Sequence, residues 1–98
     1  MIEVLYFEGC PNHESAVDLA REVLGELGLA TEIQEIEVSS AEDAERLRFL
    51  GSPSIRVNGS DIEPGADERT EFALSCRVYG ASGLPPRELI VAALEAAR

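Results

Sequence analysis

Cys10 is the residue of this chain whose type and position best suit covalent chemistry. It follows a short apolar run over residues 2–7 and precedes Pro11, which suits the first position of a helix. Cys10 is therefore predicted at the helix N-cap, where unpaired backbone N–H groups and the helix dipole favour thiolate over thiol. A thiolate is the form of cysteine that attacks disulfides and binds soft metal ions.

The composition limits the classes of partner that this thiol could meet. Acidic residues outnumber basic ones by 19 to 8, and the resulting net charge of -11 repels nucleic-acid phosphates and anionic membranes. The chain shows no signal peptide and no membrane span, so we expect a cytoplasmic protein in which a stable structural disulfide is not favoured. We therefore expect no nucleic acid, no membrane and no bound cofactor.

The hydrophobic pattern predicts a single α/β domain over residues 1–98, with the element order β-α-β-α-β-β-α. Gly28 is a typical helix terminator, Ser39 or Ser40 can cap a second helix, and Asn58-Gly59 is typical of a two-residue hairpin turn. The predicted strands cover residues 2–7, 31–38, 54–57 and 60–63, and the predicted helices cover residues 11–26, 40–50 and a segment opened by Pro85-Pro86.

Residues 65–83 form an insertion before the last helix. Within it, Phe72, Leu74, Cys76 and Val78 alternate with other residues, as in an additional strand. This alternation makes two interpretations of Cys76 possible. Its side chain either packs in the core with the apolar members of the alternation or serves chemistry together with Cys10.

The order of these elements, with Cys10-Pro11 after the first strand and Ser52-Pro53 before the third, resembles the thioredoxin superfamily, and glutaredoxin-like small proteins in particular. The resemblance covers most of the chain. It implies a mixed four-stranded sheet flanked by helices, a nucleophilic Cys10, and a cis-proline at Pro53 that orients bound substrate. Pro11, Ser52 and Pro53 are then expected at a substrate-binding site for a protein or low-molecular-weight thiol or disulfide.

The sequence departs from the family's C-x-x-C motif because His13 stands where the second cysteine would be, which gives C-P-N-H. A disulfide within the motif is impossible, so the resolving thiol must come from Cys76, a low-molecular-weight thiol or a partner. His13, as the third residue of the helix, either stabilises the Cys10 thiolate as an imidazolium or is an exposed polar residue.

The geometry implied by the resemblance makes the insertion leave and return at the edge of the sheet that holds Cys10, so it could bring Cys76 over Cys10. Arg77 and Tyr79 then become candidates for ligand contacts. Arg46, Arg48 and Arg56 either line a ligand groove or lie on solvated faces, and the second interpretation is preferred.

Three functions fit these features. The preferred one is a thiol-disulfide oxidoreductase with Cys10, His13 and Cys76 at its catalytic site and no metal ligands. A second is a binding domain that keeps the fold without activity. A third is a module that binds a soft metal or an organomercurial through Cys10 and Cys76, since two thiolates suffice for mercury.

Overall fold

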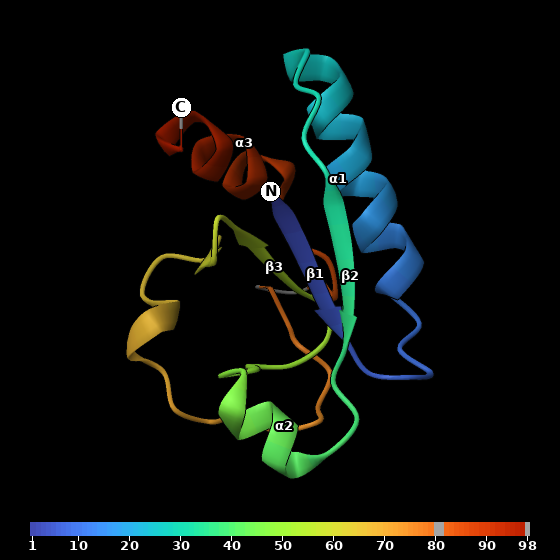
Figure 1. Cartoon of the computed structure of the whole chain (residues 1–98), viewed down its shortest axis with the longest axis vertical. Coiled ribbons are helices and arrows are strands. Elements are labelled where there is room, and N and C mark those ends of the chain that lie inside the picture. Colours follow the sequence, from blue (N-terminus) through green and yellow to red (C-terminus); the bar gives the residue numbers. More distant parts are fainter. Residues whose placement is uncertain (80–81, 98) are drawn as a thin grey trace.

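A mixed four-stranded sheet forms the centre of the molecule (Figure 1). The structure is a computed structural model that describes residues 1–79 and 82–97. The strands lie in the order β2-β1-β3-β4, with β2 parallel to β1 and with β3 antiparallel to both β1 and β4. Their bounds are Ile2–Tyr6 for β1, Ile33–Glu37 for β2, Ser54–Val57 for β3 and Ser60–Asp61 for β4. The predicted α/β class and mixed four-stranded sheet are confirmed.

The helices bury two separate apolar clusters against this sheet. α1 (His13–Leu27) and α3 (Arg87–Ala96) pack over one cluster, which includes residues from β1 and β3. α2 (Ala41–Arg46) lies at the end of the sheet toward which β1 and β2 point (Figure 1), and it contributes Ala44 to a second cluster with Leu5, Val38 and Phe49. Within residues 1–79 and 82–97, no helix is long and apolar enough to cross a membrane.

The predicted hairpin and the first helix end are present. Asn58 and Gly59 have φ angles of 51° and 86° and connect β3 to β4 with a two-residue turn. At the end of α1, Gly28 has a φ of 66°, its N–H donates to the Gly25 carbonyl, and the Leu29 N–H donates to the Leu24 carbonyl. This pair of bonds is the Schellman motif, with glycine in its left-handed position.

α2 ends earlier than the predicted residue 50. The Ser40 hydroxyl accepts a bond from the Asp43 N–H, as the capping pattern predicts, but the helix stops at Arg46. Here too a Schellman motif ends the helix, because the Arg48 N–H donates to the Glu45 carbonyl and the Phe49 N–H to the Ala44 carbonyl. Arg48 occupies the left-handed position with a φ of 54°, at a cost of about 1–2 kcal/mol relative to glycine.

Residues 65–83 contain no additional strand among the positions described. They hold a short 3-10 helix, Ala66–Glu68, and isolated bridges that join Ser52 to Cys76 and Tyr79 to Ser82. The alternation expected of the apolar side chains is reversed, because Leu74, Cys76 and Val78 are exposed whereas Arg77 and Tyr79 are buried. The interpretation of Cys76 as a core residue is therefore wrong. The part of the prediction that fell on residues 80 and 81 lies outside the described residues.

Gly51 is required where residues 75–77 approach the loop before β3. Its φ is 122°, and a Cβ at this position would lie 3.1 Å from both the Ser75 carbonyl oxygen and Arg77 Cβ. Gly28 also has a positive φ, yet a Cβ there would meet nothing within 4 Å. A side chain at Gly28 would therefore meet backbone strain alone, whereas one at Gly51 would meet both backbone strain and steric crowding.

We expect Gly51→Ala to lower the free energy of unfolding by about 3 kcal/mol, because a strained backbone angle is combined with a contact that must shift. Gly28→Ala is the matched control and should cost about 1 kcal/mol, from the backbone angle alone. Urea denaturation of both variants measures the difference. Equal losses would show that residues 75–77 do not press on Gly51.

Candidate functional site

Cys10 lies in a tight turn between β1 and α1 and not at the helix N-cap. Its N–H donates to the Phe7 carbonyl at 3.2 Å, and its carbonyl accepts from the His13 N–H at 3.4 Å. The helix begins at His13 with Asn12 as its N-cap, so the predicted helix start at Pro11 and the capping role of Cys10 are wrong. Cys10, Pro11 and Asn12 belong to this turn and precede the helix. The thiol remains partly exposed at the end of β1.

The Asn12 side chain fixes the other side of this turn. A Cβ placed on Gly83 would lie only 2.2 Å from Asn12 Nδ2, so the Asn12 amide occupies the space that a side chain at position 83 would need. The insertion therefore does return beside the Cys10 turn before α3 begins.

The loop before β3 is covered by residues 75–79. The Ser52–Pro53 peptide bond is cis. The Ser52 N–H donates to the Ser75 carbonyl at 2.7 Å, and the Arg77 N–H donates to the Ser52 carbonyl at 2.9 Å. The Tyr79 hydroxyl donates to the Pro53 carbonyl at 2.7 Å. Cys76 is thus held beside the Pro53 loop with its side chain exposed.

The register of the sheet relates this loop to the Cys10 turn. β1 and β3 pair Leu5 with Ser54. Continuing the antiparallel register by two residues brings Phe7 opposite Ser52. Phe7 accepts the hydrogen bond of Cys10, and Ser52 bridges to Cys76. The segments that carry the two cysteines therefore meet the sheet at the same end, where Figure 1 shows the loop after β1 in blue and the segment before α3 in orange.

Arg77 holds this segment in place through a buried network of ion pairs. Its side chain is 1% exposed, and its guanidinium makes a bidentate contact with Asp61 at 2.7 and 3.0 Å. It also donates to Glu63 at 2.8 Å and to the Ser54 hydroxyl at 2.9 Å, and it stacks over the Tyr79 ring. Burial alone would lower the pKa of Arg77, but the bonds to Asp61 and Glu63 outweigh burial and raise it.

This network changes the interpretation of two predicted ligand-contacting residues. Arg77 and Tyr79 are buried, and the contacts of their polar groups are made within the protein. The residues that sequence reasoning missed are the partners of Arg77, namely Asp61 and Glu63, which follow the hairpin turn. An acidic pair at alternate positions beyond an Asn-Gly turn is a signal that could have indicated a basic partner on the neighbouring segment.

Tyr79 should make the protein unstable at high pH. Burial raises the pKa of its hydroxyl, and although Arg77 lowers this pKa, Asp61 and Glu63 raise it further. Up to about pH 10 the folded and unfolded states both hold the proton. Above that pH only the folded state holds it, so stability falls by as much as about 1.4 kcal/mol per pH unit. Denaturation at several pH values above 9 measures this slope.

Tyr79→Phe should remove most of that alkaline slope and should cost about 1 kcal/mol at neutral pH, where the bond to the Pro53 carbonyl is lost. Tyr6→Phe is the control, because the pKa of Tyr6 is also raised, mainly by burial, but Tyr6 is not held within the Arg77 network. An unchanged slope in Tyr79→Phe would mean that another group controls alkaline unfolding.

His13 lies at the first position of α1 and not at the predicted third position. Its ring stacks on Tyr6 with centroids 3.5 Å apart, and its Nε2 bonds Glu35 Oε1 at 2.6 Å. The side chain is 19% exposed, so it is not the exposed polar residue of the second interpretation. The imidazole joins α1 to β1 and β2, and its hydrogen bond goes to Glu35 and not to Cys10.

We expect His13→Ala to lower the free energy of unfolding by about 1–2 kcal/mol, because both the ring stack and a partly exposed hydrogen bond are lost. His13→Phe keeps the stack and should recover about half of this loss. The alkylation rate of Cys10 at pH 7 should be nearly the same in His13→Phe as in the wild type. A rate several-fold lower would show that the imidazole acts on the thiol.

The soft-metal interpretation needs only the Cys10 and Cys76 thiolates as ligands. Across the part of the chain that the structure describes, no group of three His, Cys, Asp or Glu side chains is placed to hold a metal ion.

Comparison of the chain with protein-family models, with curated proteins and with solved structures found no match.

Proposed function

We propose that the chain is a thioredoxin-like thiol-disulfide oxidoreductase in which Cys10 is the nucleophile and the resolving thiol comes from outside the C-P-N-H segment. Cys76 is the resolving residue that the chain itself offers. The observation that carries the proposal is the bridge between Ser52 and Cys76, since it holds an exposed thiol beside the Pro53 loop at the end of the sheet where Cys10 lies.

The arrangement of the sheet supports the proposal. The strand order β2-β1-β3-β4, with one parallel and two antiparallel pairs, is compatible with a thioredoxin-like fold. A cis Ser52–Pro53 bond directly before β3 and a cysteine in the loop after β1 are the features that the resemblance of the sequence implies. The order of the residues and the conformation of the backbone are therefore both compatible with the proposed thioredoxin-like arrangement.

The surroundings of Cys76 fit contact with a partner. Leu74 and Val78, which flank it along the segment, are large apolar residues with exposed fractions of 42% and 62%. Exposed apolar side chains next to a thiol give a disulfide-bearing partner a surface to contact before exchange. The net charge of -11 disfavours anionic macromolecules, so a protein or a low-molecular-weight disulfide is the proposed substrate class.

The proposed reaction conserves electrons at each exchange. The Cys10 thiolate attacks one sulfur of the substrate disulfide, which forms a mixed disulfide and releases the other substrate sulfur as a thiolate. The Cys76 thiolate then attacks Cys10 Sγ, which releases the second substrate thiolate and leaves a Cys10–Cys76 disulfide. The substrate has gained two electrons and the protein has lost two. A reducing thiol is needed to restore the protein.

Reaction of the fully reduced protein with glutathione disulfide tests this sequence. The wild type should release two glutathione molecules for each chain and finish with an internal disulfide. Cys76→Ser should release one and retain one glutathionyl group on Cys10, because the second exchange lacks its thiol. Mass spectrometry of intact and digested protein distinguishes these products.

Cys10→Ser is the matched control for a thiol that is merely exposed, since it retains Cys76. The proposed order of attack predicts that Cys76→Ser, which retains Cys10, forms its mixed disulfide with glutathione disulfide faster than Cys10→Ser does. If the two variants react at the same rate, the chain is better described as a binding domain without redox activity. If the wild type keeps a glutathionyl group as Cys76→Ser does, the resolving thiol is external.

A further inference from the structure

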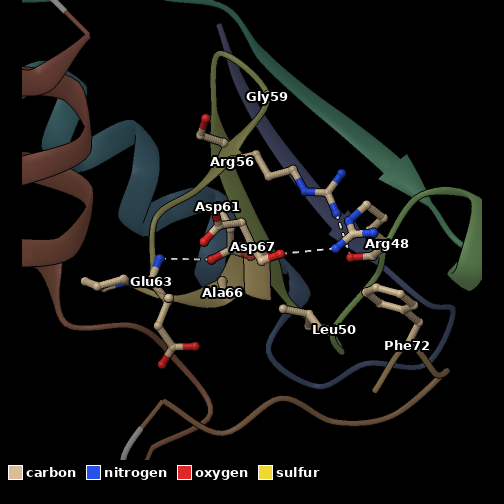
Figure 2. A pocket seen from close by; sticks show the side chains of 12 residues that line it. Arg48, Leu50, Arg56, Gly59, Asp61, Glu63, Ala66, Asp67 and Phe72 are labelled. Carbon is tan, nitrogen blue, oxygen red and sulfur yellow. Dashed lines mark hydrogen bonds between the residues drawn. The ribbon is translucent and has the colours of Figure 1, made fainter. Parts of the chain in front are cut away.

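A cavity of about 430 Å³ is lined by residues of β4, of the 3-10 helix and of the segment after α2 (Figure 2). Its wall contains neither cysteine and no part of the Ser52–Pro53 loop. Arg48 and Arg56 both line it, and Figure 2 shows their guanidinium groups next to each other. We propose that this cavity is a binding site for a small organic anion, held by these two arginines.

Arg48 and Arg56 differ from the other described arginines in their hydrogen-bond partners. In the part of the chain that the structure describes, every other arginine forms an ion pair with a carboxylate. Arg48 and Arg56 instead bond only backbone carbonyls. Arg48 donates to the Asp67 carbonyl at 3.2 Å, and Arg56 donates to the Leu47 and Arg48 carbonyls at 2.6 and 3.0 Å.

These bonds leave donors available. The bonds of each arginine to described residues use Nη2 alone, so Nε and Nη1 of both guanidinium groups can serve another acceptor. In a chain of net charge -11, two adjacent cations without a carboxylate partner are unexpected. Burial lowers the pKa of Arg56, the nearby charges of Asp61 and Glu3 partly oppose this, and repulsion by Arg77 and Arg48 lowers the pKa further. A bound anion would offset both the burial and the repulsion.

The backbone of Arg48 provides independent support. Arg48 holds the left-handed position of a helix-ending motif, the position that Gly28 holds at the end of α1. Glycine would adopt this conformation without strain. The arginine side chain stacks over Phe72 at 4.9 Å and reaches the cavity. A strained residue whose side chain lines a cavity is a typical sign of a functional position.

The lining also indicates the class of ligand. Two planar guanidinium forks suit a carboxylate or a phosphate group. Leu50, Phe72 and Ala66 add apolar surface for an attached organic part. Asp61 and Glu63 also line the cavity, but both form ion pairs with Arg77, and Glu63 shares Arg69 with Glu71. The cavity volume falls within the range of about 300–1,000 Å³ that is usual for small-molecule sites.

Calorimetric titration of the reduced full chain at low ionic strength tests the proposal with phenyl phosphate, benzoate and the uncharged analogue benzamide as probes. We expect saturable binding of at least one of the two anions and none of benzamide. The tighter of the two anions identifies the site as one for phosphates or for carboxylates. Chemical-shift changes on binding should centre on Arg48 and Phe72.

Arg48→Gly should weaken binding by at least about tenfold, because it removes a charge-assisted fork while suiting the helix end. Arg46→Gln is the matched control, since Arg46 is an exposed arginine of α2 that pairs with Asp43, and it should bind as the wild type does. Thermal melts confirm that both variants fold. The proposal is overturned if neither anion saturates below about 10 mM or if Arg48→Gly retains wild-type affinity.

Discussion

The buried contact between Arg77 and the carboxylates of Asp61 and Glu63 is the interaction on which the arrangement of the C-terminal third depends. It ties a segment without regular secondary structure to β4 and to the residues just after it. A buried ion pair stabilises only when its hydrogen bonds are well satisfied, and removal of one partner typically costs about 3–5 kcal/mol. Because Arg77 faces inward, the neighbouring Cys76 faces solvent.

The same segment brings together parts of the chain that are distant in sequence. Its backbone bonds to Ser52, the Tyr79 hydroxyl bonds to Pro53, and Gly83 lies against Asn12 beside the Cys10 turn. The position of Cys76 thus depends on this network of polar contacts, and the same segment returns beside the Cys10 turn. The proposed exchange requires the two sulfurs to reach bonding distance, and both thiols are exposed or partly exposed.

Sequence reasoning predicted those elements whose determinants are local. The Asn58-Gly59 turn, the Gly28 helix end and the Ser40 cap are each specified within a few residues, and β3 has the predicted bounds. The failures all have tertiary causes. α2 ends early at a left-handed Arg48 whose carbonyl accepts a bond from Arg56, and Arg77 faces inward because it pairs with Asp61 and Glu63.

In the candidate site too, the features set by local sequence were predicted and those set by tertiary contacts were not. The chain order placed Cys10 after a strand and Pro53 before one, and both positions are found. The partners of His13 could not be predicted, because Tyr6 and Glu35 lie on two different strands and become neighbours only through the parallel pairing of β1 with β2. The position of Cys10 within its turn was also missed, since Asn12 replaces it as the helix cap.

The two hydrogen bonds between Ser52 and residues 75–77 also bear on selectivity. Extended polypeptides are commonly recognised by adding a strand to an unpaired backbone edge. Here both the N–H and the carbonyl of Ser52 are already used by the chain itself. An extended peptide therefore finds no open backbone partner at this position while residues 75–77 remain bound. For the proposed oxidoreductase activity, this predicts a preference for compact disulfides, or disulfides on the surface of folded proteins, over unfolded chains.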